Sequence, residues 1–511
     1  MQEEIHSGAP WASAGRQPKI AIVGAGMSGI AAVIKLRKAG YRNLTVYEKA
    51  DRVGGTWREN SYPGLSCDIP SRWYSFRFAL NPEWTHRFSY GPEIQAYMEK
   101  VARDFDVESV IRFGTPVKSL DYVTLPDEEA PKWRLVTESG EASLYDVVIS
   151  ATGILHQPVM PDIPGLERFE GTSFHSARWD HSVRLEGKRV GVIGTGSTAA
   201  QIVGDITSRV DKMVVFQRTP QWMVPLPQTE YSPWQKRLLR LLPFLQWIPY
   251  FFYYWAGLRT FGAATVGDKK MQARLSRACE TNLEQNVPDR DLRARLTPDY
   301  QAACKRLILC SSFYPAISSE NAELVTETIR EIDARGVRTE DGQLHELDVL
   351  VLATGFDPSA FILPTKVTGE KGLDLEKFWH RAPRAHRAVA MPGFPNFWML
   401  EGPTGPVGNL SLITISEHQI EFVIQMLDKM KRDGHAAISA REEAYVAYND
   451  AMREALPNTV WMSGGCTSWY MDDSGLPNLY PWAPERYLKS MRRPKFEEFH
   501  LRDEAAAIAS A

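Results

Sequence analysis

Two glycine-rich segments have the residue types and spacing that bind a pyrophosphate. The first, Gly24-Ala25-Gly26-Met27-Ser28-Gly29, follows a short β-branched run and precedes a helical pattern. The first glycine of such a loop permits a tight turn, the second lets backbone amides approach the pyrophosphate, and the third allows close helix packing. Glu48 ends the next apolar run, where an acid accepts hydrogen bonds from ribose hydroxyls. The segment predicts a dinucleotide with an unphosphorylated ribose; the alternative is a glycine-rich turn beside a solvated glutamate.

The second segment, Gly194-Thr195-Gly196-Ser197-Thr198-Ala199, has the same context but a different residue at the ribose position. Its next strand ends on Arg218-Thr219 rather than on an acid, and arginine pairs with a 2′-phosphate. Such a charge-assisted contact favours NADPH over NADH by about ten- to hundredfold. A surface arginine without a ligand is the alternative. Two dinucleotide sites in one chain, the acid-marked one first, predict a bound flavin that NADPH reduces.

The elements that must position these loops are alternating strands and helices. Each loop lies in a strand-loop-helix-strand unit, so we expect an α/β protein with two Rossmann-like dinucleotide-binding domains, for FAD and for NADPH. Two segments, 145–153 and 347–357, share a pattern in which a buried strand ends on Ala-Thr-Gly. We interpret them as equivalent points at which the chain leaves each of the two sheets, called the exits below. The Arg- and aromatic-rich stretch from 223 to 303 has helical spacing and predicts a helical insertion in the NADPH domain. The expected FAD domain is 1–155 plus 353–511, and the expected NADPH domain is 156–222 plus 304–352.

Composition argues against several other classes of function. The 511 residues carry 59 basic and 62 acidic side chains, a formal net charge of −3 with no basic face, which argues against nucleic-acid partners. The five cysteines are an odd number without a C-x-x-C pair. We therefore expect neither a disulfide framework nor a cysteine metal site, no metal cofactor, and a reducing cytoplasm as the compartment.

Two stretches bear on targeting and membrane contact. Residues 1–19 have no apolar core and begin with acids, so they are interpreted as a flexible lead-in rather than a signal peptide. Eighteen uncharged residues, 241–258, approach the lower limit for spanning a bilayer, but Pro243, Gln246 and Pro249 argue against spanning. We expect a buried or aromatic-rich helical insert there, with shallow membrane contact as the alternative.

Two further motifs connect the chain to a known family. Residues 169–180 match F-x-G-x-x-x-H-x-x-x-W-[P/D] through Phe169, Gly171, His175, Trp179 and Asp180. The pattern [A/G]-G-x-W-x4-[F/Y]-P-[G/M]-x3-D is matched by Gly54-Gly55-Thr56-Trp57, by Tyr62-Pro63-Gly64 and by Asp68. With these motifs the chain resembles the type I Baeyer–Villiger monooxygenases, class B flavoprotein monooxygenases related to the flavin-containing monooxygenases. The resemblance extends from about Lys19 to Trp482, and it implies that the 55–57 segment helps to bind the flavin cofactor.

The resemblance also implies individual roles. Arg306 resembles the active-site arginine beside the flavin, and Asp68 resembles the acid that orients it. Lys305 resembles the lysine that joins Arg218 at the NADPH phosphate. Trp469 resembles a mobile tryptophan on the nicotinamide side. The family's histidine, here His175, lies between domains in relatives, where it transmits domain position rather than performing chemistry.

The chemistry of oxygen transfer supports a role for Arg306 independently of the resemblance. Oxygen transfer to a ketone develops negative charge in a site without bulk water, and a permanently charged guanidinium stabilises that charge. Each of these residues also has an alternative role. The alternatives are that Arg306 is a second phosphate ligand beside Lys305, that Asp68 is a helix cap, and that Trp57 and Trp179 are packed aromatics.

The implied reaction is a Baeyer–Villiger oxidation. NADPH reduces FAD, dioxygen adds at the flavin C4a position, and the resulting peroxide attacks a ketone to give an ester or lactone, with sulfoxidation as a side activity. The first alternative is an N- or S-oxygenating flavin-containing monooxygenase, which the Trp179-Asp180 pair disfavours. A pyridine nucleotide-disulfide reductase is disfavoured because no C-x-x-C is present, and a flavin-binding protein without turnover is a third alternative.

Overall fold

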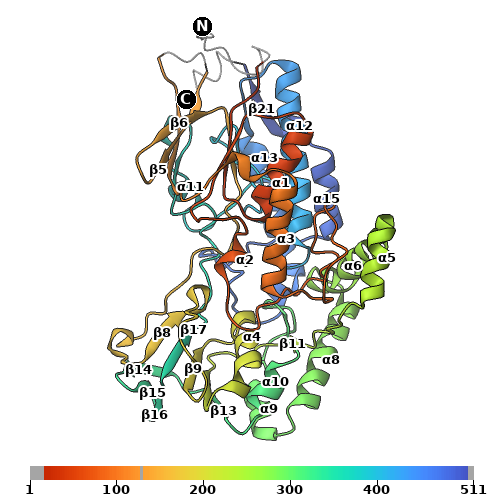
Figure 1. Cartoon of the computed structure of the whole chain (residues 1–511). Helices are drawn as coiled ribbons and strands as arrows, with labels where there is room; N and C mark the ends of the chain where they lie inside the picture. The colour runs from red at the N-terminus through yellow and green to blue at the C-terminus, as the bar shows by residue number, and fades with distance from the viewer. Residues whose placement is uncertain (1–15, 127–129, 504–511) are drawn as a thin grey trace.

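The computed structural model describes residues 16–126 and 130–503, which form two parallel sheets with helices and smaller sheets packed around them (Figure 1). Most of the predicted N-terminal lead-in lies outside these residues. The first sheet has the strand order β19-β7-β1-β2-β3 with parallel pairing throughout. Its strands are β1 (Ile20–Val23), β2 (Leu44–Tyr47), β3 (Ile111–Arg112), β7 (Val147–Ser150) and β19 (Phe397–Met399). Their short, continuous apolar runs are typical of strands covered on both faces.

The second sheet repeats this architecture with the order β13-β10-β9-β17-β8, again all parallel. Its strands are β8 (Thr172–His175), β9 (Arg189–Ile193), β10 (Lys212–Phe216), β13 (Ala322–Val325) and β17 (Val349–Leu352). Each glycine loop connects a central strand to a helix, β1 to α1 (Met27–Lys38) and β9 to α4 (Ser197–Ile206). The predicted pair of Rossmann-like folds is confirmed.

Smaller sheets and further helices complete the two folds. A four-stranded sheet in the order β18-β4-β5-β6 adjoins the first fold, and the hairpins β14-β15-β16 adjoin the second. These strands are β4 (Val117–Val123), β5 (Lys132–Thr137), β6 (Ala142–Tyr145), β18 (Lys366–Thr368), β14 (Ile329–Asp333), β15 (Gly336–Thr339) and β16 (Leu344–Glu346), and β20 (Ala437–Ala440) pairs with β21 (Phe499–Arg502). The remaining helices of the two folds are α2 (Thr56–Glu59), α3 (Gly91–Asp104), α10 (Phe313–Ile317), α11 (Leu375–Trp379), α12 (Leu412–Asp433), α13 (Glu442–Ala455), α14 (Val460–Ser463) and α15 (Pro484–Arg492). Helix α12 packs against α1, so the C-terminal part of the chain covers the first nucleotide loop.

The predicted helical insertion is confirmed between β11 (Met223–Val224) and β12 (Ile308–Leu309), two short strands that pair where the insertion leaves and rejoins the second fold. It contains α5 (Pro233–Leu241), α6 (Trp247–Gly257), α7 (Ala263–Thr265), α8 (Lys269–Asn286) and α9 (Arg290–Leu296). The Asp268 carboxylate caps α8 by accepting the N–H groups of Lys270 and Met271. Among residues 16–126 and 130–503, no helix is both long and apolar enough to cross a bilayer.

Candidate active site

The first glycine loop turns so tightly that side chains are excluded at Gly24 and Gly29. Gly24 has a φ of +105°, and a Cβ there would lie 2.6 Å from the carbonyl oxygen of Ala151, at the exit of β7. A Cβ on Gly29 would lie 2.0 Å from the Gly24 carbonyl oxygen. Gly26 faces Gly55, whose own Cβ would come 3.0 Å from the Gly26 Cα. The loop and the Gly54–Gly55 turn therefore form a glycine-lined cradle at the N-terminus of α1, which fits a pyrophosphate.

Glu48 is buried beside this loop and holds it in place. One carboxylate oxygen accepts the Ala25 N–H at 2.8 Å, and the other accepts the Ala50 N–H at 3.0 Å. The guanidinium of Arg58 lies 3.1 Å from the same carboxylate. Glu48 is thus where the sequence places it, at the end of β2 next to the loop, and its contact with a ribose stays a prediction.

The second glycine loop repeats the first and is more open. Gly194 has a φ of +119°, and a Cβ there would lie 2.4 Å from the carbonyl oxygen of Ala353, at the exit of β17. This contact matches that of Gly24 with Ala151 and confirms that the two Ala-Thr-Gly segments are equivalent exits. No atom lies within 4 Å of a Cβ added to Gly196, so the backbone before α4 is accessible to a ligand. Thr195 Oγ1 donates to the Thr219 carbonyl at 2.8 Å and ties the loop to the end of β10.

Two basic side chains meet beside this second loop. Arg218 is exposed just after β10, and half-buried Lys305 places its Nζ 5.0 Å from the centre of the Tyr300 ring. Burial and then the nearby positive charge of Arg218 lower the pKa of Lys305. Two cations that repel each other are stabilised by an anion between them, so this pair fits a phosphate.

Residues 62–68 dock the first fold onto α4 of the second. Tyr62 Oη donates to Gln201 Oε1 at 3.0 Å, and Gln201 Nε2 donates to the Ser66 carbonyl at 3.0 Å. Gly64, with a φ of +79°, lies so close to α4 that a Cβ would be 2.5 Å from the Gln201 carbonyl oxygen. This docking brings Asp68, at the end of the segment, to the boundary between the two folds.

Arg306 reaches across this boundary to Asp68. Its Nη2 donates to Asp68 Oδ2 at 2.5 Å, and the two side chains are 33% and 24% exposed. The Asp68 carboxylate raises the pKa of Arg306, so the guanidinium is charged at every working pH. The buried side chain of Tyr470 lies close to Arg306 and, after Asp68, also raises the pKa of the guanidinium. The site thus holds a fixed positive charge, and part of the Arg306 side chain remains exposed.

Trp469 stands next to this group. Its ring lies 4.4 Å, centre to centre, from the ring of Tyr470, and both line a small cavity. Other residues that line the cavity come from the exits of both sheets and from the C-terminal part of the chain: Ile154, Pro358, Phe361, Gly402, Thr404, Val407, Asn478 and Leu479. The structure therefore brings the predicted tryptophan to the predicted arginine through Tyr470, a residue that the sequence argument did not select.

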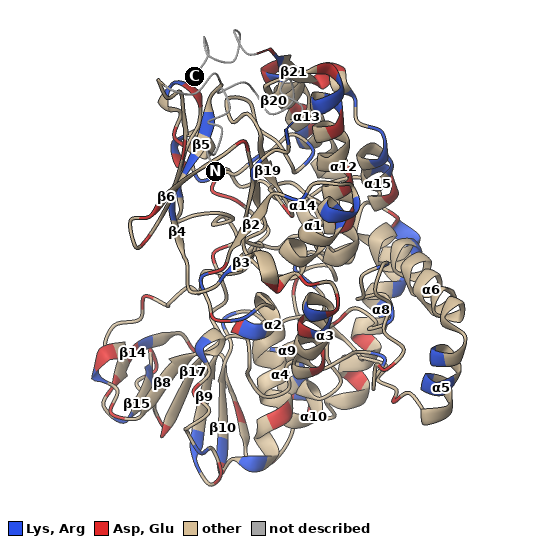
Figure 2. Ribbon diagram, turned by 45° about the horizontal axis from the view of Figure 1, so that its top comes forward, with Lys and Arg blue, Asp and Glu red and all other residues tan. Residues whose placement is uncertain are grey.

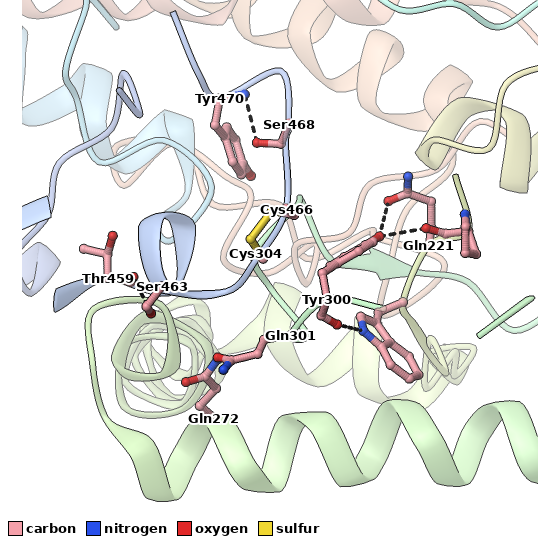
Figure 3. Close-up of a disulfide and its surroundings, with 12 residues drawn as sticks. Gln221, Gln272, Tyr300, Gln301, Cys304, Thr459, Ser463, Cys466, Ser468 and Tyr470 are labelled. Atoms are coloured by element: carbon pink, nitrogen blue, oxygen red, sulfur yellow. Dashed lines mark hydrogen bonds between the residues drawn. A yellow bond between two sulfur atoms is a disulfide. The ribbon is translucent and has the colours of Figure 1, made fainter. Parts of the chain in front are cut away.

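A disulfide joins Cys304 to Cys466, which contradicts the expectation that no cysteines pair (Figure 3). The two residues are separated by 162 positions, and spacing of this size carries no sign of proximity. The bridge ties the segment that carries Arg306 to the loop that carries Trp469. Because two of the five cysteines pair while the other three stay free and buried, the cysteine count does not argue for a reducing compartment.

His175 joins the two connections between the folds. Its Nδ1 accepts the Ala177 N–H at 3.1 Å, so its Nε2 carries the proton and donates to the Gly355 carbonyl at 3.1 Å. Gly355 also accepts the N–H of Val159, in the other connection, at 3.0 Å. Burial lowers the pKa of His175, which keeps the ring neutral. Both nitrogens are occupied by backbone, which supports a role in domain position rather than in chemistry.

The other residues of the two family motifs make packing contacts. Trp179 packs edge-on against Phe174 at 5.0 Å, and a Cβ on Gly171 would lie 2.5 Å from the Phe169 ring. Asp180 accepts the N–H and hydroxyl of Ser182, which ends the motif in a turn. Trp57 Nε1 donates to Tyr74 Oη at 3.0 Å, and that hydroxyl donates to Met27 Sδ at the start of α1. The packing alternatives for both tryptophans are thus observed contacts.

Glu401 is a buried acid at the first loop that the sequence argument missed. Its Oε1 accepts hydrogen bonds from Ser28 at 3.1 Å and from Ser416, in α12, at 2.7 Å. Burial raises the pKa of Glu401 to about 7. No local pattern could have identified this residue, because Ser28 precedes it by 373 positions.

We expect Glu401→Gln to remove a pH dependence of stability. A carboxyl whose pKa rises from its ordinary 4.5 to about 7 on folding binds more protons in the native state, so stability is lost as the pH rises through this window. The loss above the window is on the order of 3 kcal/mol. The melting temperature of the wild type should therefore fall relative to the variant between pH 5 and 8, a range set by the pKa of about 7. Parallel curves for the two proteins would contradict the buried acid, and Glu167→Gln, on the surface, is the control.

Comparison with known proteins decides the family. Residues 17–249 match the model of flavin-binding monooxygenase-like proteins. A Baeyer–Villiger monooxygenase of Streptomyces coelicolor is 37% identical over 96% of this chain and 94% of its own length. The chain belongs to the Baeyer–Villiger monooxygenase family. An uncharacterized monooxygenase of Mycobacterium tuberculosis is 44% identical over 97% of this chain and 99% of its own length. The solved complex of OTEMO with FAD and NADP superposes with a TM-score of 0.85 at 26% identity, covering 95% of this chain and 100% of that one.

This member of the family is a flavin monooxygenase that uses FAD and NADP(H). The residues present fit both groups, since each glycine loop leaves the backbone bare at a helix N-terminus and the second adds two cations. Membership of the family sets aside the disulfide reductase and the flavin-binding protein without turnover. No cluster of three or more His, Cys, Asp or Glu side chains that could hold a metal ion occurs in the described part of the chain.

Proposed function

We propose that the enzyme converts ketones to esters or lactones and oxidises sulfides as a side activity. The balanced reaction takes ketone, dioxygen, NADPH and a proton, and it releases ester, NADP⁺ and water. FAD, when bound, supplies the redox chemistry by accepting a hydride from NADPH and activating dioxygen. The side chains around Trp469 are mainly apolar, which suits an apolar substrate.

The observation that supports this proposal is the Arg306–Asp68 pair between the two nucleotide folds. Negative charge develops on oxygen while an oxygen atom is inserted beside a carbonyl, and a fixed cation stabilises it. Asp68 takes one arm of Arg306, which orients the guanidinium and leaves its other nitrogens for the reacting oxygens. Tyr470, in the loop that carries Trp469, lies beside the arginine.

The remaining residues bind and orient the cofactors in this proposal. Glu48 accepts from the FAD ribose, and the cradle at Gly26 and Gly55 receives the FAD pyrophosphate. Arg218 and Lys305 hold the 2′-phosphate of NADPH. Ser28, Thr56 and Trp57 complete the FAD site, and Ser197, Thr198 and Thr219 complete the NADPH site, with Trp469 on the nicotinamide side.

A product-based substrate screen tests the proposed function. The holoenzyme is incubated with NADPH and cyclic, linear and aryl ketones, and with one alkyl aryl sulfide, and the products are identified by mass spectrometry. We expect esters or lactones from at least one class of ketone. Product is scored instead of NADPH loss because uncoupled release of hydrogen peroxide also consumes NADPH. Oxidation of the sulfide with no ester from any ketone would favour the S-oxygenating alternative.

A further inference from the structure

The outer surface of the insertion is apolar to an extent found nowhere else in the described chain. The described residues of the chain include fourteen exposed large hydrophobic side chains, and nine of them lie within 234–255. These nine are Trp234, Leu238, Leu241, Leu242, Phe244, Ile248, Phe251, Phe252 and Trp255. We call them the apolar patch. It lies on α5, on α6 and on the 3-10 turn Pro243–Gln246 that joins them. The predicted helical insert is therefore present, but one of its faces is not buried.

Helix α6 is apolar on two opposite faces. Its outward face carries Ile248, Phe251, Phe252 and Trp255, which have the i, i+3, i+4, i+7 spacing of a stripe made to contact another apolar phase. Its inward face already packs on the first fold, where Tyr254 meets Trp73 edge-on at 6.1 Å. Because packing within the protein is provided by the inward face, the outward stripe requires an external partner.

The shape and length of the α5–α6 helix pair suit contact with the surface of a membrane rather than a passage across it. In Figures 1 and 2, α5 and α6 project from the side of the molecule, away from both sheets. Helix α6 has 11 residues, about 16 Å, against a hydrocarbon core of about 30 Å. A projecting helix pair of this size reaches the headgroup and upper acyl region of one leaflet.

The charges around the patch identify the partner. From Tyr231 to Gly267 the sequence contains four basic residues and no acid, in a chain whose formal net charge is −3. The bases are Lys236, Arg237, Arg240 and Arg259. In Figure 2 the ribbon of α5 carries blue Lys and Arg positions, and most of the α6 ribbon is tan. Arg259 lies 5.1 Å from the Trp255 ring, so cation and aromatic ring sit together as at a membrane interface. Arg240 pairs with Glu83 at 2.7 Å.

We propose that the apolar patch binds the surface of an anionic phospholipid bilayer. Its large side chains enter the headgroup and acyl boundary while the basic residues meet lipid phosphates. A second copy of this chain fits the patch less well. A two-fold contact would place the same basic segment of each copy against the other with no acid of the segment to neutralise it. Anionic lipid satisfies both the apolar stripe and the charge.

Vesicle sedimentation with the holoenzyme tests this proposal. The probes are vesicles of pure phosphatidylcholine and vesicles of equal parts phosphatidylcholine and phosphatidylglycerol. We expect binding to the anionic vesicles to be at least about tenfold tighter, because each basic residue near a charged surface adds favourable energy. The double variant Ile248→Ser/Phe252→Ser should lose about tenfold or more of that binding through lost apolar burial. Lys236→Gln/Arg237→Gln should weaken binding to the anionic vesicles alone.

Controls separate loss of the patch from loss of the fold. Met160→Ser/Val446→Ser removes two exposed apolar side chains outside the patch and should sediment like the wild type. Flavin content and melting temperature should be equal in all variants. Ile248 and Phe252 are each 66% exposed, so their replacement should not disturb the fold. Equal sedimentation of the wild type and the Ile248/Phe252 variant would overturn the proposal. A wild-type dimer in lipid-free sedimentation velocity that this variant converts to a monomer would also overturn it, by assigning the patch to a second copy.

Discussion

Replacing Arg306 with alanine is expected to lower ester formation by at least about a hundredfold. The guanidinium is the fixed positive charge held between the two nucleotide folds, and Asp68 holds one of its arms. Reduction of the flavin by NADPH should continue in this variant, because Lys305 and Arg218 are intact. NADPH consumption should then release hydrogen peroxide instead of ester. Stopped-flow bleaching of the flavin, peroxide release and ester yield are the three measurements.

Two further variants show whether the position or only the charge matters. Arg306→Lys keeps a cation but loses the fork that serves a carboxylate and a second anion together, so it should recover little ester. Arg338→Ala is the matched control, because Arg338 pairs with Asp333 at 2.9 Å with similar exposure, on the hairpin β14-β15. Its ester yield should equal that of the wild type. Near-normal ester yield from Arg306→Ala would remove the arginine from the proposed mechanism.

The sequence was most informative where the backbone itself makes the site. A glycine is required where a Cβ would collide with backbone, and Gly24 and Gly194 both meet this condition against the alanine of an Ala-Thr-Gly exit. Periodicity places the strands and helices around such loops, so the two folds and the positions of Glu48 and Arg218 were predictable. These features depend on local geometry that a sequence motif records.

Contacts between distant segments were not predictable in this way. The Cys304–Cys466 bridge and the bonds of Glu401 to Ser28 and Ser416 form only after the C-terminal part of the chain returns to the first fold. The Asp68–Arg306 pair was reached through the family motif, because 238 positions separate the two residues. Apolar composition likewise indicated a buried helix at 241–258, but composition does not record which faces of a helix find a partner.

The second large effect is expected from Arg218→Ala, which should change the choice of nicotinamide cofactor. NADPH carries a 2′-phosphate that NADH lacks, and exposed Arg218 lies with Lys305 beside the second glycine loop. Loss of the arginine should lower kcat/KM for NADPH by about ten- to hundredfold and leave kcat/KM for NADH nearly unchanged. Steady-state kinetics with both cofactors measures the ratio. Arg209→Ala is the control. Arg209 is an exposed arginine that directly follows α4 and pairs with Glu186.

A double-mutant cycle then shows whether Lys305 serves the same phosphate. The positive charge of Arg218 lowers the pKa of Lys305, so Arg218→Ala leaves a lysine that is more firmly protonated and keeps part of the site. If both cations hold one dianion, the loss in the double variant Arg218→Ala/Lys305→Ala differs from the sum of the single losses. Additive losses would place the two side chains on separate groups of the cofactor. An equal loss for NADH and NADPH in Arg218→Ala would place the arginine on a part that both cofactors share, and the 2′-phosphate would then require another partner.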